Sequence, residues 1–298
     1  MVVDKPAGPT SHDVVDRVRR ALRERRVGHT GTLDPFATGV LALCIGKATR
    51  LARFLSGGVK EYRASVRLGI ATTTDDLTGK PIGEPATTPV AAEALQAAVR
   101  GLVGSYDQLP PAFSARHVAG RRLYELARRG EAPARHTAAV TVHAIEVVSF
   151  AGDRLEVVVR CSAGTYVRAI ARDLGERLGV GAHLTALRRT RSGDFDLTQA
   201  VPGDDLTDAS GRLIPLAELL PELPVVRVPS ASLKRVRDGR GLGPEAVSSG
   251  FPGAAVGRVR LLDEAGRLVA LAVPRGLEPG AGALPRFPEL HADVVLLD

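Results

Sequence analysis

A loop near the N-terminus places a single carboxylate among glycines and small hydroxyl side chains. The run from Gly28 to Leu41 reads GHTGTLDPFATGVL, and Asp34 is its only acidic residue. Glycines in such a run let a large planar ligand approach the backbone closely, because they carry no side chain. A carboxylate beside that ligand can act as a nucleophile or a base. Asp34 is therefore the first candidate for a catalytic residue.

Asp34 also suits a purely structural role. Asp is favoured at the N-cap of a helix and Pro at the first helical position, so Asp34 followed by Pro35 is equally typical of a helix start. The structural role does not exclude a catalytic one, and both remain open from the spacing alone.

The elements that would position this loop follow from capping signals and hydrophobic periodicity. Thr10 or Ser11 can cap a helix that extends to about Arg25, with its apolar residues on one face and arginines on the other. Alternating apolar residues predict a strand over 60–69. Further helices are expected over 90–103 and 166–178, and further strands over 140–150 and 154–161. This order indicates a mixed chain of helices and strands.

Two segments differ in composition from the rest. Residues 104–135 are rich in Pro, Gly and Arg, which predicts an excursion from the core. Residues 200–224 carry several prolines and acidic turns, which is typical of a connection to a terminal module. Short apolar runs follow over 225–228, 255–262 and 268–273, and they predict a small β-rich barrel.

The charge of the chain favours a polyanionic partner. Its formal net charge is +7 and its pI is about 9.9. Most of the 40 basic residues are arginines, which bind phosphates in bidentate fashion. They form three clusters, and together these predict a nucleic-acid surface. The clusters are Arg17, Arg19, Arg20, Arg23, Arg25 and Arg26; Arg116, Arg121, Arg122, Arg128 and Arg129; and Arg188, Arg189 and Arg191.

Composition excludes several other classes of protein. The 298 residues are 44% hydrophobic and 24% charged, as in an ordinary globular chain, and allow a major domain with a smaller one. No apolar run is long enough to span a bilayer and no signal-peptide core is present, so we expect a cytoplasmic protein. Cys44 and Cys161 lie in apolar stretches, which predicts buried free thiols, and no metal-ligand spacing occurs.

Five blocks of sequence together resemble the TruB-type tRNA pseudouridine synthases along nearly the whole chain. The most specific is the loop pattern GHTGxLDPxAxGxL, and the other four occur in the order that the family has. They are Asp4-Lys5-Pro6, Lys60-Glu61-Tyr62, the run from Cys161 to Arg168 (CSAGTYVR), and Gly181-Ala182-His183-Leu184 through Leu187-Arg188-Arg189.

The resemblance implies a fold. The fold would be α+β, with a mixed, largely antiparallel sheet and flanking helices, plus a small C-terminal β-barrel of the PUA type. Residues 1–222 would form the catalytic domain, with an insertion at about 104–135 covering RNA, and 223–298 would form the PUA-like domain.

The resemblance also implies an activity. The chain would isomerise uridine to pseudouridine in the T loop of tRNA by base flipping, without a cofactor or metal. Its partner would be tRNA, through the T arm and the acceptor stem, and it would act as a monomer.

The resemblance also implies roles for individual residues. Asp34 would be catalytic, and Arg168 would pair with it and hold it ionised. Tyr62 would stack on the target base, Tyr166 and Leu187 would wall the uracil pocket, and His29 would fill the space that the flipped base leaves. Phe113 stands where the family often has Tyr, and Thr73 where it has an acid. Contacts with the RNA backbone are expected from Lys60, Arg121, Arg122, Arg188 and Arg189.

Three other activities can be compared with this one. A phosphate-binding NTPase is excluded, because Ala48 follows Gly46-Lys47 where Ser or Thr must hold magnesium. A glycosidase would need a second carboxylate paired with Asp34, and these blocks supply none. A non-catalytic RNA-binding protein or tRNA-folding chaperone would account for the arginines, but it leaves Asp34, Tyr62 and Arg168 unexplained.

Overall fold

The computed structural model describes residues 1–112, 117–118, 121–122, 136–252, 257–275 and 289–297. These residues form two compact units. The first comprises 1–43 and 55–210, and the second comprises 44–54 and 211–298. No helix in the described ranges is long and apolar enough to cross a membrane. The domain boundary expected after residue 222 stays a prediction.

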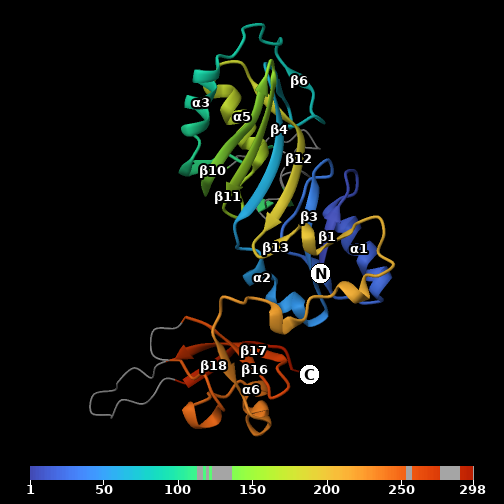
Figure 1. Ribbon diagram of the computed structural model, residues 1–298, viewed down its shortest axis with the longest axis vertical. Coiled ribbons are helices and arrows are strands. Elements are labelled where there is room, and N and C mark those ends of the chain that lie inside the picture. The colour runs from blue at the N-terminus through green and yellow to red at the C-terminus, as the bar shows by residue number, and fades with distance from the viewer. Residues whose placement is uncertain (113–116, 119–120, 123–135, 253–256, 276–288, 298) are drawn as a thin grey trace, which may run out of the picture. The chain divides into compact units, whose positions relative to one another are not determined.

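A ten-stranded mixed sheet is the framework of the first unit (Figure 1). Its strands are β1 (Val2–Lys5), β2 (Val27–His29), β3 (Thr38–Ile45), β4 (Lys60–Leu68), β7 (Gly104–Gln108), β10 (Ala138–Ala151), β11 (Arg154–Cys161), β12 (Ala182–Ser192), β13 (Phe195–Asp196) and β14 (Ala200–Pro202). The main order is β14-β1-β3-β12-β4-β11-β10-β7, with β13 beside β12 and β2 beside β3. The pairs β1–β14 and β3–β12 are parallel, while β4 is antiparallel to both its neighbours. The α+β class with a mixed sheet is confirmed.

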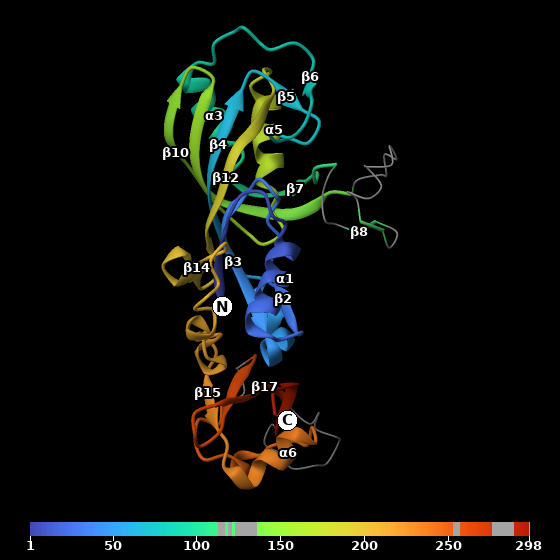
Figure 2. The same cartoon turned by 90° about the vertical axis from the view of Figure 1, so that its right-hand side faces the viewer.

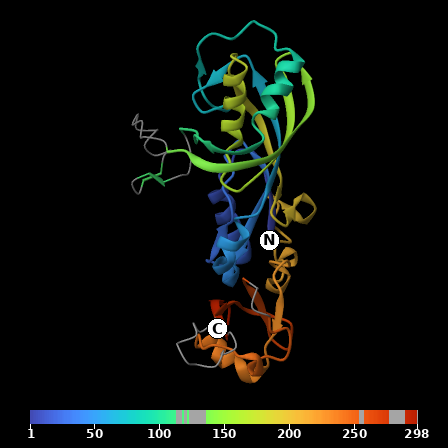
Figure 3. The same ribbon diagram turned by 90° about the vertical axis from the view of Figure 1, so that its left-hand side faces the viewer.

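Helices α3 (Ala92–Arg100) and α5 (Val167–Arg177) lie on the same side of this sheet (Figure 3). The side chains of β4 alternate as expected, because Tyr62, Ala64, Val66 and Leu68 are buried while Arg63 and Arg67 are exposed. The buried set packs in one core with Leu95 of α3 and Ile170 of α5. The core thus anchors both β4 and α5, which carry candidate site residues.

Helix α1 (Ser11–Leu22) begins with the predicted cap and lies beside β2 (Figure 2). Thr10 and Asp13 form a reciprocal capping box, in which the Thr10 side chain accepts from the Asp13 amide and the Asp13 carboxylate accepts from the Thr10 amide. The helix ends three residues before Arg25, because Arg23 takes a left-handed conformation with φ 51° and ψ 32°.

Two segments that the composition placed outside the core contain strands of the main sheet. Ala200–Pro202 was expected in a connection, but it forms β14 and pairs in parallel with β1. Gly104–Gln108 was expected in an excursion, but it forms β7 and pairs with β10. Both are edge strands, and an edge strand needs only one partner and few apolar residues. Composition alone was therefore a poor guide to them.

A four-stranded sheet is the framework of the second unit. It has the order β15 (Val225–Arg227), β16 (Val259–Leu262), β17 (Leu268–Arg275) and β18 (Glu289–Val295). This confirms short strands near the predicted apolar runs.

Short elements complete the two units. They are η1 (Gly46–Leu51), α2 (Ala52–Leu55), β5 (Ala71–Thr72), β6 (Pro81–Ile82), β8 (His117–Val118), β9 (Arg121–Arg122), η2 (Leu197–Gln199), η3 (Ser210–Arg212), η4 (Leu216–Glu218), η5 (Ser230–Ser232), α6 (Leu233–Arg237) and η6 (Pro244–Ala246).

Candidate active site

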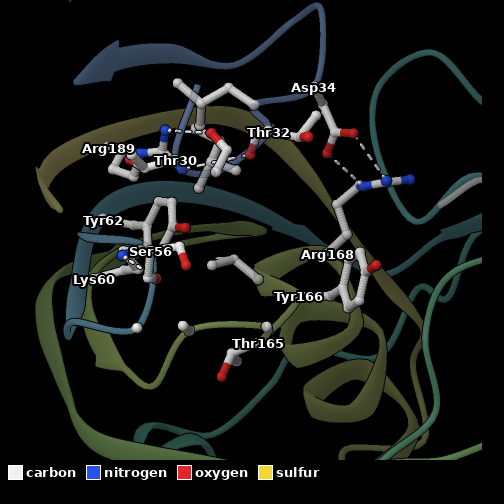
Figure 4. A pocket seen from close by; sticks show the side chains of 17 residues that line it. Thr30, Thr32, Asp34, Ser56, Lys60, Tyr62, Thr165, Tyr166, Arg168 and Arg189 are labelled. Atoms are coloured by element: carbon white, nitrogen blue, oxygen red, sulfur yellow. Dashed lines mark hydrogen bonds and ion pairs between the residues drawn. The ribbon is translucent and has the colours of Figure 1, made fainter. Parts of the chain in front are cut away.

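Asp34 and Arg168 form a two-pronged ion pair between segments far apart in the sequence (Figure 4). Arg168 Nε lies 2.9 Å from Asp34 Oδ2, and Arg168 Nη2 donates to Asp34 Oδ1 over 3.0 Å. Such a fork holds a carboxylate in one orientation as well as balancing its charge. Asp34 keeps 33% of its side chain exposed, whereas Arg168 keeps 4%. Arg168 therefore fixes the carboxylate on its buried side, and the carboxylate remains accessible to a ligand.

The loop that carries Asp34 is shaped by contacts with the first residues of the chain. Lys5 Nζ donates to the carbonyl of Pro35 over 3.1 Å, and the Gly8 amide donates to the same oxygen over 2.8 Å. No helix begins at Pro35, so the N-cap reading of Asp34 is wrong. Instead the Ala37 amide closes a turn onto the Asp34 carbonyl at 3.1 Å. The side chain of Asp34 is thus free to meet Arg168.

A second buried carboxylate, that of Asp76, lies behind Arg168. Asp76 Oδ2 is 3.5 Å from Arg168 Nη1, and that nitrogen also donates to the Thr74 carbonyl over 3.0 Å. Asp76 Oδ1 accepts bonds from the Thr74 hydroxyl at 2.6 Å and from the Thr78 amide at 2.9 Å. The sequence signal for Asp76 is the run Thr72-Thr73-Thr74-Asp75-Asp76, in which Asp76 keeps the last acid of the pattern that the TruB-type synthases have there.

These two carboxylates account for a buried arginine in the first turn of α5. A cation at a helix N-terminus is disfavoured by the helix dipole, and a buried one needs compensation. Arg168 obtains it from Asp34 and Asp76. Arg168 is therefore not the surface arginine that its position at a helix start would otherwise suggest.

The pKa of Asp34 is raised above the ordinary aspartate value. Burial contributes most to this rise, Arg168 opposes it by its charge, and the negative charge of Asp76 adds to it. The carboxylate form of Asp34 is consequently lost at a higher pH than that of an exposed aspartate. Any activity that needs this carboxylate should fall as the pH drops through the raised pKa.

A cavity of about 540 Å³ opens beside Asp34. Figure 4 shows Tyr62 and Asp34 on opposite sides of the space, with Tyr166 below Arg168. Tyr62 comes from β4 and Leu187 from β12, next to each other in the sheet because Leu187 pairs with Ala64. The cavity can hold a small planar ring between an aromatic face and a carboxylate. Its lining is Thr30, Gly31, Thr32, Leu33, Asp34, Ser56, Gly57, Lys60, Tyr62, Ala163, Gly164, Thr165, Tyr166, Val167, Arg168, Leu187 and Arg189.

The phenol of Tyr62 remains neutral at the wall of this cavity. The residue is 8% exposed, and burial raises its pKa, although the charge of Arg189 and a hydrogen bond from it lower the pKa. A neutral phenol can both donate and accept a hydrogen bond. Tyr62 can therefore combine stacking with hydrogen bonding to a ligand in the cavity.

Arg189 was expected to contact the RNA backbone, and the structure corrects this. It is 2% exposed, and its guanidinium donates to the carbonyls of Val40 at 2.7 Å and Gly31 at 2.9 Å. A guanidinium that is buried and bonded in this way has no free face for a phosphate. Arg189 instead connects the Gly31 end of the Asp34 loop to the sheet, and its side chain also lines the cavity.

Lys60 was also expected at the RNA backbone, and its ammonium is likewise inside the protein. Lys60 is 5% exposed, and its Nζ donates to the carbonyls of Ser56 at 3.0 Å and Gly58 at 2.9 Å. The Ser56–Gly57 end of this turn lines the cavity. Lys60 thus stabilises one wall of the cavity instead of contacting the RNA backbone. Buried and exposed residues alternate along β4, and this alternation places Lys60 on the buried face. The alternation is the feature of the sequence that indicates the burial of Lys60.

Lys60→Met should remove a pH dependence of stability. Burial lowers the pKa of Lys60 from 10.5 to about 8, with Arg189 lowering it further and Cys161 raising it. Between these values the unfolded chain binds more protons, so this group makes the free energy of unfolding rise with pH. The rise should be at most about 1.4 kcal/mol per pH unit relative to Lys60→Met. Urea unfolding at several pH values from 7.5 to 10 measures it, with exposed Lys80→Met as the control. Parallel pH curves for wild type and Lys60→Met would contradict the assignment.

The other predicted site residues lie around the cavity or outside the described side chains. His29 is half-buried on β2 and does not line the cavity, and burial lowers its pKa, so its ring is neutral. Arg188 pairs with both oxygens of Asp4, at 3.1 and 2.6 Å, and is 39% exposed. Arg121 and Arg122 form β9, whose side chains the structure does not describe, and Phe113 lies outside the described residues.

The buried thiols are where composition placed them. Cys44 and Cys161 are both buried and free. In the described part of the chain, no group of three or more His, Cys, Asp or Glu side chains is arranged to hold a metal ion.

Comparisons with known proteins match both the sequence and the fold. Residues 19–167 match the family model of the TruB family pseudouridylate synthase N-terminal domain, and residues 168–219 that of the tRNA pseudouridylate synthase B C-terminal domain. A tRNA pseudouridine synthase B from Thermobifida fusca is 45% identical, covering 92% of this chain and 94% of the relative. One from Synechococcus sp. is 44% identical over the same shares. A chain in the structure of an H/ACA RNP bound to a substrate RNA containing 2'-deoxyuridine has a TM-score of 0.71 and 25% identity, covering 100% of this chain and 85% of that one.

Proposed function

Since the chain belongs to the TruB family of pseudouridylate synthases, we propose that it isomerises a uridine in the T loop of tRNA and that Asp34 is the catalytic residue. The observation that carries the assignment of Asp34 is its forked ion pair with Arg168 at the mouth of a cavity faced by Tyr62. A single carboxylate, aimed and accessible, is what the reaction needs from the protein.

The reaction exchanges one bond of the uridine for another. The bond between uracil N1 and ribose C1′ breaks, the base turns, C5 joins C1′, and the C5 proton leaves while N1 gains one. Atoms and electrons balance without an oxidant. Asp34 acts beside the sugar and the base, as a nucleophile toward either or as a base toward a ribose proton. Tyr62 lies across the cavity, where it can stack on the ring and relay the C5 proton, taking it at the phenol oxygen while it passes its own hydroxyl proton on.

Base flipping brings the uridine to this carboxylate. The glycosidic bond and C5 of a stacked base are shielded, so the nucleotide must leave the stack to reach a cavity of about 540 Å³. Tyr166 and Leu187 would then pack against the uracil. His29, which is near the cavity but outside its lining, suits the space vacated in the RNA.

The remaining expectations concern how the RNA is held. We propose that 1–222 is the catalytic domain and 223–298 a PUA-like domain that contacts the acceptor stem, with the four-stranded sheet of the second unit as part of a barrel. The enzyme would act as a monomer in the cytoplasm, where tRNA is modified. Arg121 and Arg122 would contact the RNA backbone from the insertion.

A direct assay tests the proposed function. A T-arm stem-loop carrying uridine tritiated at C5 should release tritium when incubated with the protein, and the product should contain pseudouridine. A stem-loop with cytidine at the target position is the control. Binding without tritium release would support a non-catalytic RNA-binding protein or tRNA-folding chaperone instead.

Asp76→Asn should shift the acidic limb of the pH–rate profile to lower pH. Asp76 raises the pKa of Asp34, so removal of its charge lowers that pKa and keeps the Asp34 carboxylate at lower pH. The maximal rate should fall by roughly tenfold or more, because Arg168 loses one of the groups that orient it. Single-turnover rates from pH 4.5 to 8 measure both effects. Asp75→Asn is the matched control, since Asp75 pairs with Arg172, and an unmoved limb for Asp76→Asn would contradict the coupling.

A further inference from the structure

A dense run of arginines lies at the C-terminal end of α1, outside the cavity described above. Residues 17–26 contain six arginines and one glutamate. Arg17 donates to the Gly203 carbonyl, and Arg19 is bound to Asp16 and to the Val27 carbonyl. The other four, Arg20, Arg23, Arg25 and Arg26, are exposed, and we call them the terminal arginine patch.

The patch has little negative charge to balance it. Glu24, its one acidic neighbour in the run, accepts from the Arg26 amide at 2.8 Å and lies 3.6 Å from Arg26 Nε. No acidic side chain of the described ranges lies within ion-pair distance of Arg20, Arg23 or Arg25. Four guanidinium groups with one carboxylate form a strongly positive exposed surface.

Helix stability does not account for this concentration of charge. Cations in the last turn interact well with the helix dipole, which covers Arg19 and Arg20, but the effect ends within that turn. Arg25 and Arg26 lie beyond it. Arg23 has φ 51°, a conformation that favours glycine, so a long cationic side chain there costs stability. The patch therefore fits an external anion better than a role within the fold.

Strand β2 places the patch close to the candidate active site. It connects Arg26 to Thr30, and Thr30 lines the cavity. At about 3.3 Å per residue, four steps of strand separate the two by roughly 13 Å. Phosphates on one strand of a duplex follow each other at about 3.4 Å along the axis, so the Arg26 end of the patch lies within a few nucleotides of a base in the cavity. Figure 2 shows α1 and β2 side by side at this place.

We propose that the terminal arginine patch binds backbone phosphates of the RNA arm whose target uridine occupies the cavity. The inference rests on the proposed function, because it takes an RNA as the occupant of the cavity. Guanidinium groups suit this role, since their planar fork matches a phosphate in bidentate fashion. Such contacts carry no sequence information, so the patch adds affinity and orientation for any T arm.

Arg23→Gly separates RNA binding from folding, because the two expected effects have opposite signs. Glycine relieves the left-handed conformation, so the melting temperature should stay the same or rise. Loss of one phosphate contact should weaken binding of a T-arm stem-loop about threefold to tenfold near 0.1 M salt. It should also reduce the slope of log affinity against log salt by roughly 0.7 to 0.9. Arg25→Ala should give the same two binding effects with little change in melting temperature.

Arg100→Ala is the matched control, since Arg100 is an exposed arginine in the last turn of α3. Its salt slope should equal that of the wild type. Binding is measured directly, so the result stands even if the wild type releases no tritium. Wild-type salt slopes for Arg23→Gly and Arg25→Ala would overturn the proposal. An equal or greater loss in binding of polyglutamate would assign the patch to an acidic protein and overturn the assignment to RNA.

Discussion

Asp34→Asn should abolish isomerisation while tRNA still binds. The amide keeps the shape of the carboxylate and one acceptor oxygen, but it has no charge with which to act as a nucleophile or base. Affinity comes mostly from phosphate contacts away from the reacting carbon, so the loss should lie in the chemical step. We expect the single-turnover rate at saturating enzyme to fall on the order of a thousandfold or more.

Asp153→Asn is the control for this variant, because Asp153 is an exposed aspartate that pairs with exposed Arg67. Its rate should match the wild type. A dissociation constant for Asp34→Asn within about threefold of the wild type would locate the defect in chemistry. A rate for Asp34→Asn within tenfold of the wild type would remove Asp34 from the mechanism.

Arg168→Lys should lower the rate strongly although the positive charge is kept. One ammonium cannot reproduce the hydrogen bond and the ion-pair contact to Asp34 together with the contacts to Asp76 and the Thr74 carbonyl. Asp34 then loses its orientation, and we expect a loss of roughly a hundredfold in the maximal rate. Arg168 also lowers the pKa of Asp34, so weakening the pair raises that pKa and moves the acidic limb to higher pH.

The direction of this shift is opposite to that expected for Asp76→Asn, and the two variants therefore check each other. Arg172→Lys is the matched control, because Arg172 lies one turn further along α5 and pairs with Asp75 and Asp173 instead of Asp34. An acidic limb that moves to lower pH in Arg168→Lys, or a rate equal to that of Arg172→Lys, would show that the fork is not what orients Asp34.

Local features of the fold could be predicted because they depend on neighbours in the sequence. The capping box of Thr10 and Asp13 needs only a spacing of three residues, and the buried face of β4 follows from alternation. The ends of elements were less certain. Helix α1 stops at Leu22 because the backbone turns left-handed at Arg23, which no side-chain preference of arginine predicts.

The candidate site also contains residues that motifs in the sequence identify and one residue whose partner only the fold shows. Asp34, Tyr62, Tyr166, Arg168 and Leu187 could be named from motifs, and the structure brings all five to one cavity. Their roles stay predictions until the variants are measured. Asp76 was visible in the sequence but had no assigned role, because its partner is 92 positions away and only the fold places the two together.

Charge alone could not distinguish an exposed arginine that can contact RNA from a buried arginine that stabilises the fold. Arg188 and Arg189 are adjacent in the sequence, yet Arg189 is buried against loop carbonyls while Arg188 is partly exposed beside Asp4. Successive residues of a strand point to opposite faces, and only the packing around β12 decides which face is inside. The sequence by itself determined the family, the candidate carboxylate and the positive charge. The tertiary structure decided which charges are buried, because burial depends on segments that meet only when the chain has folded.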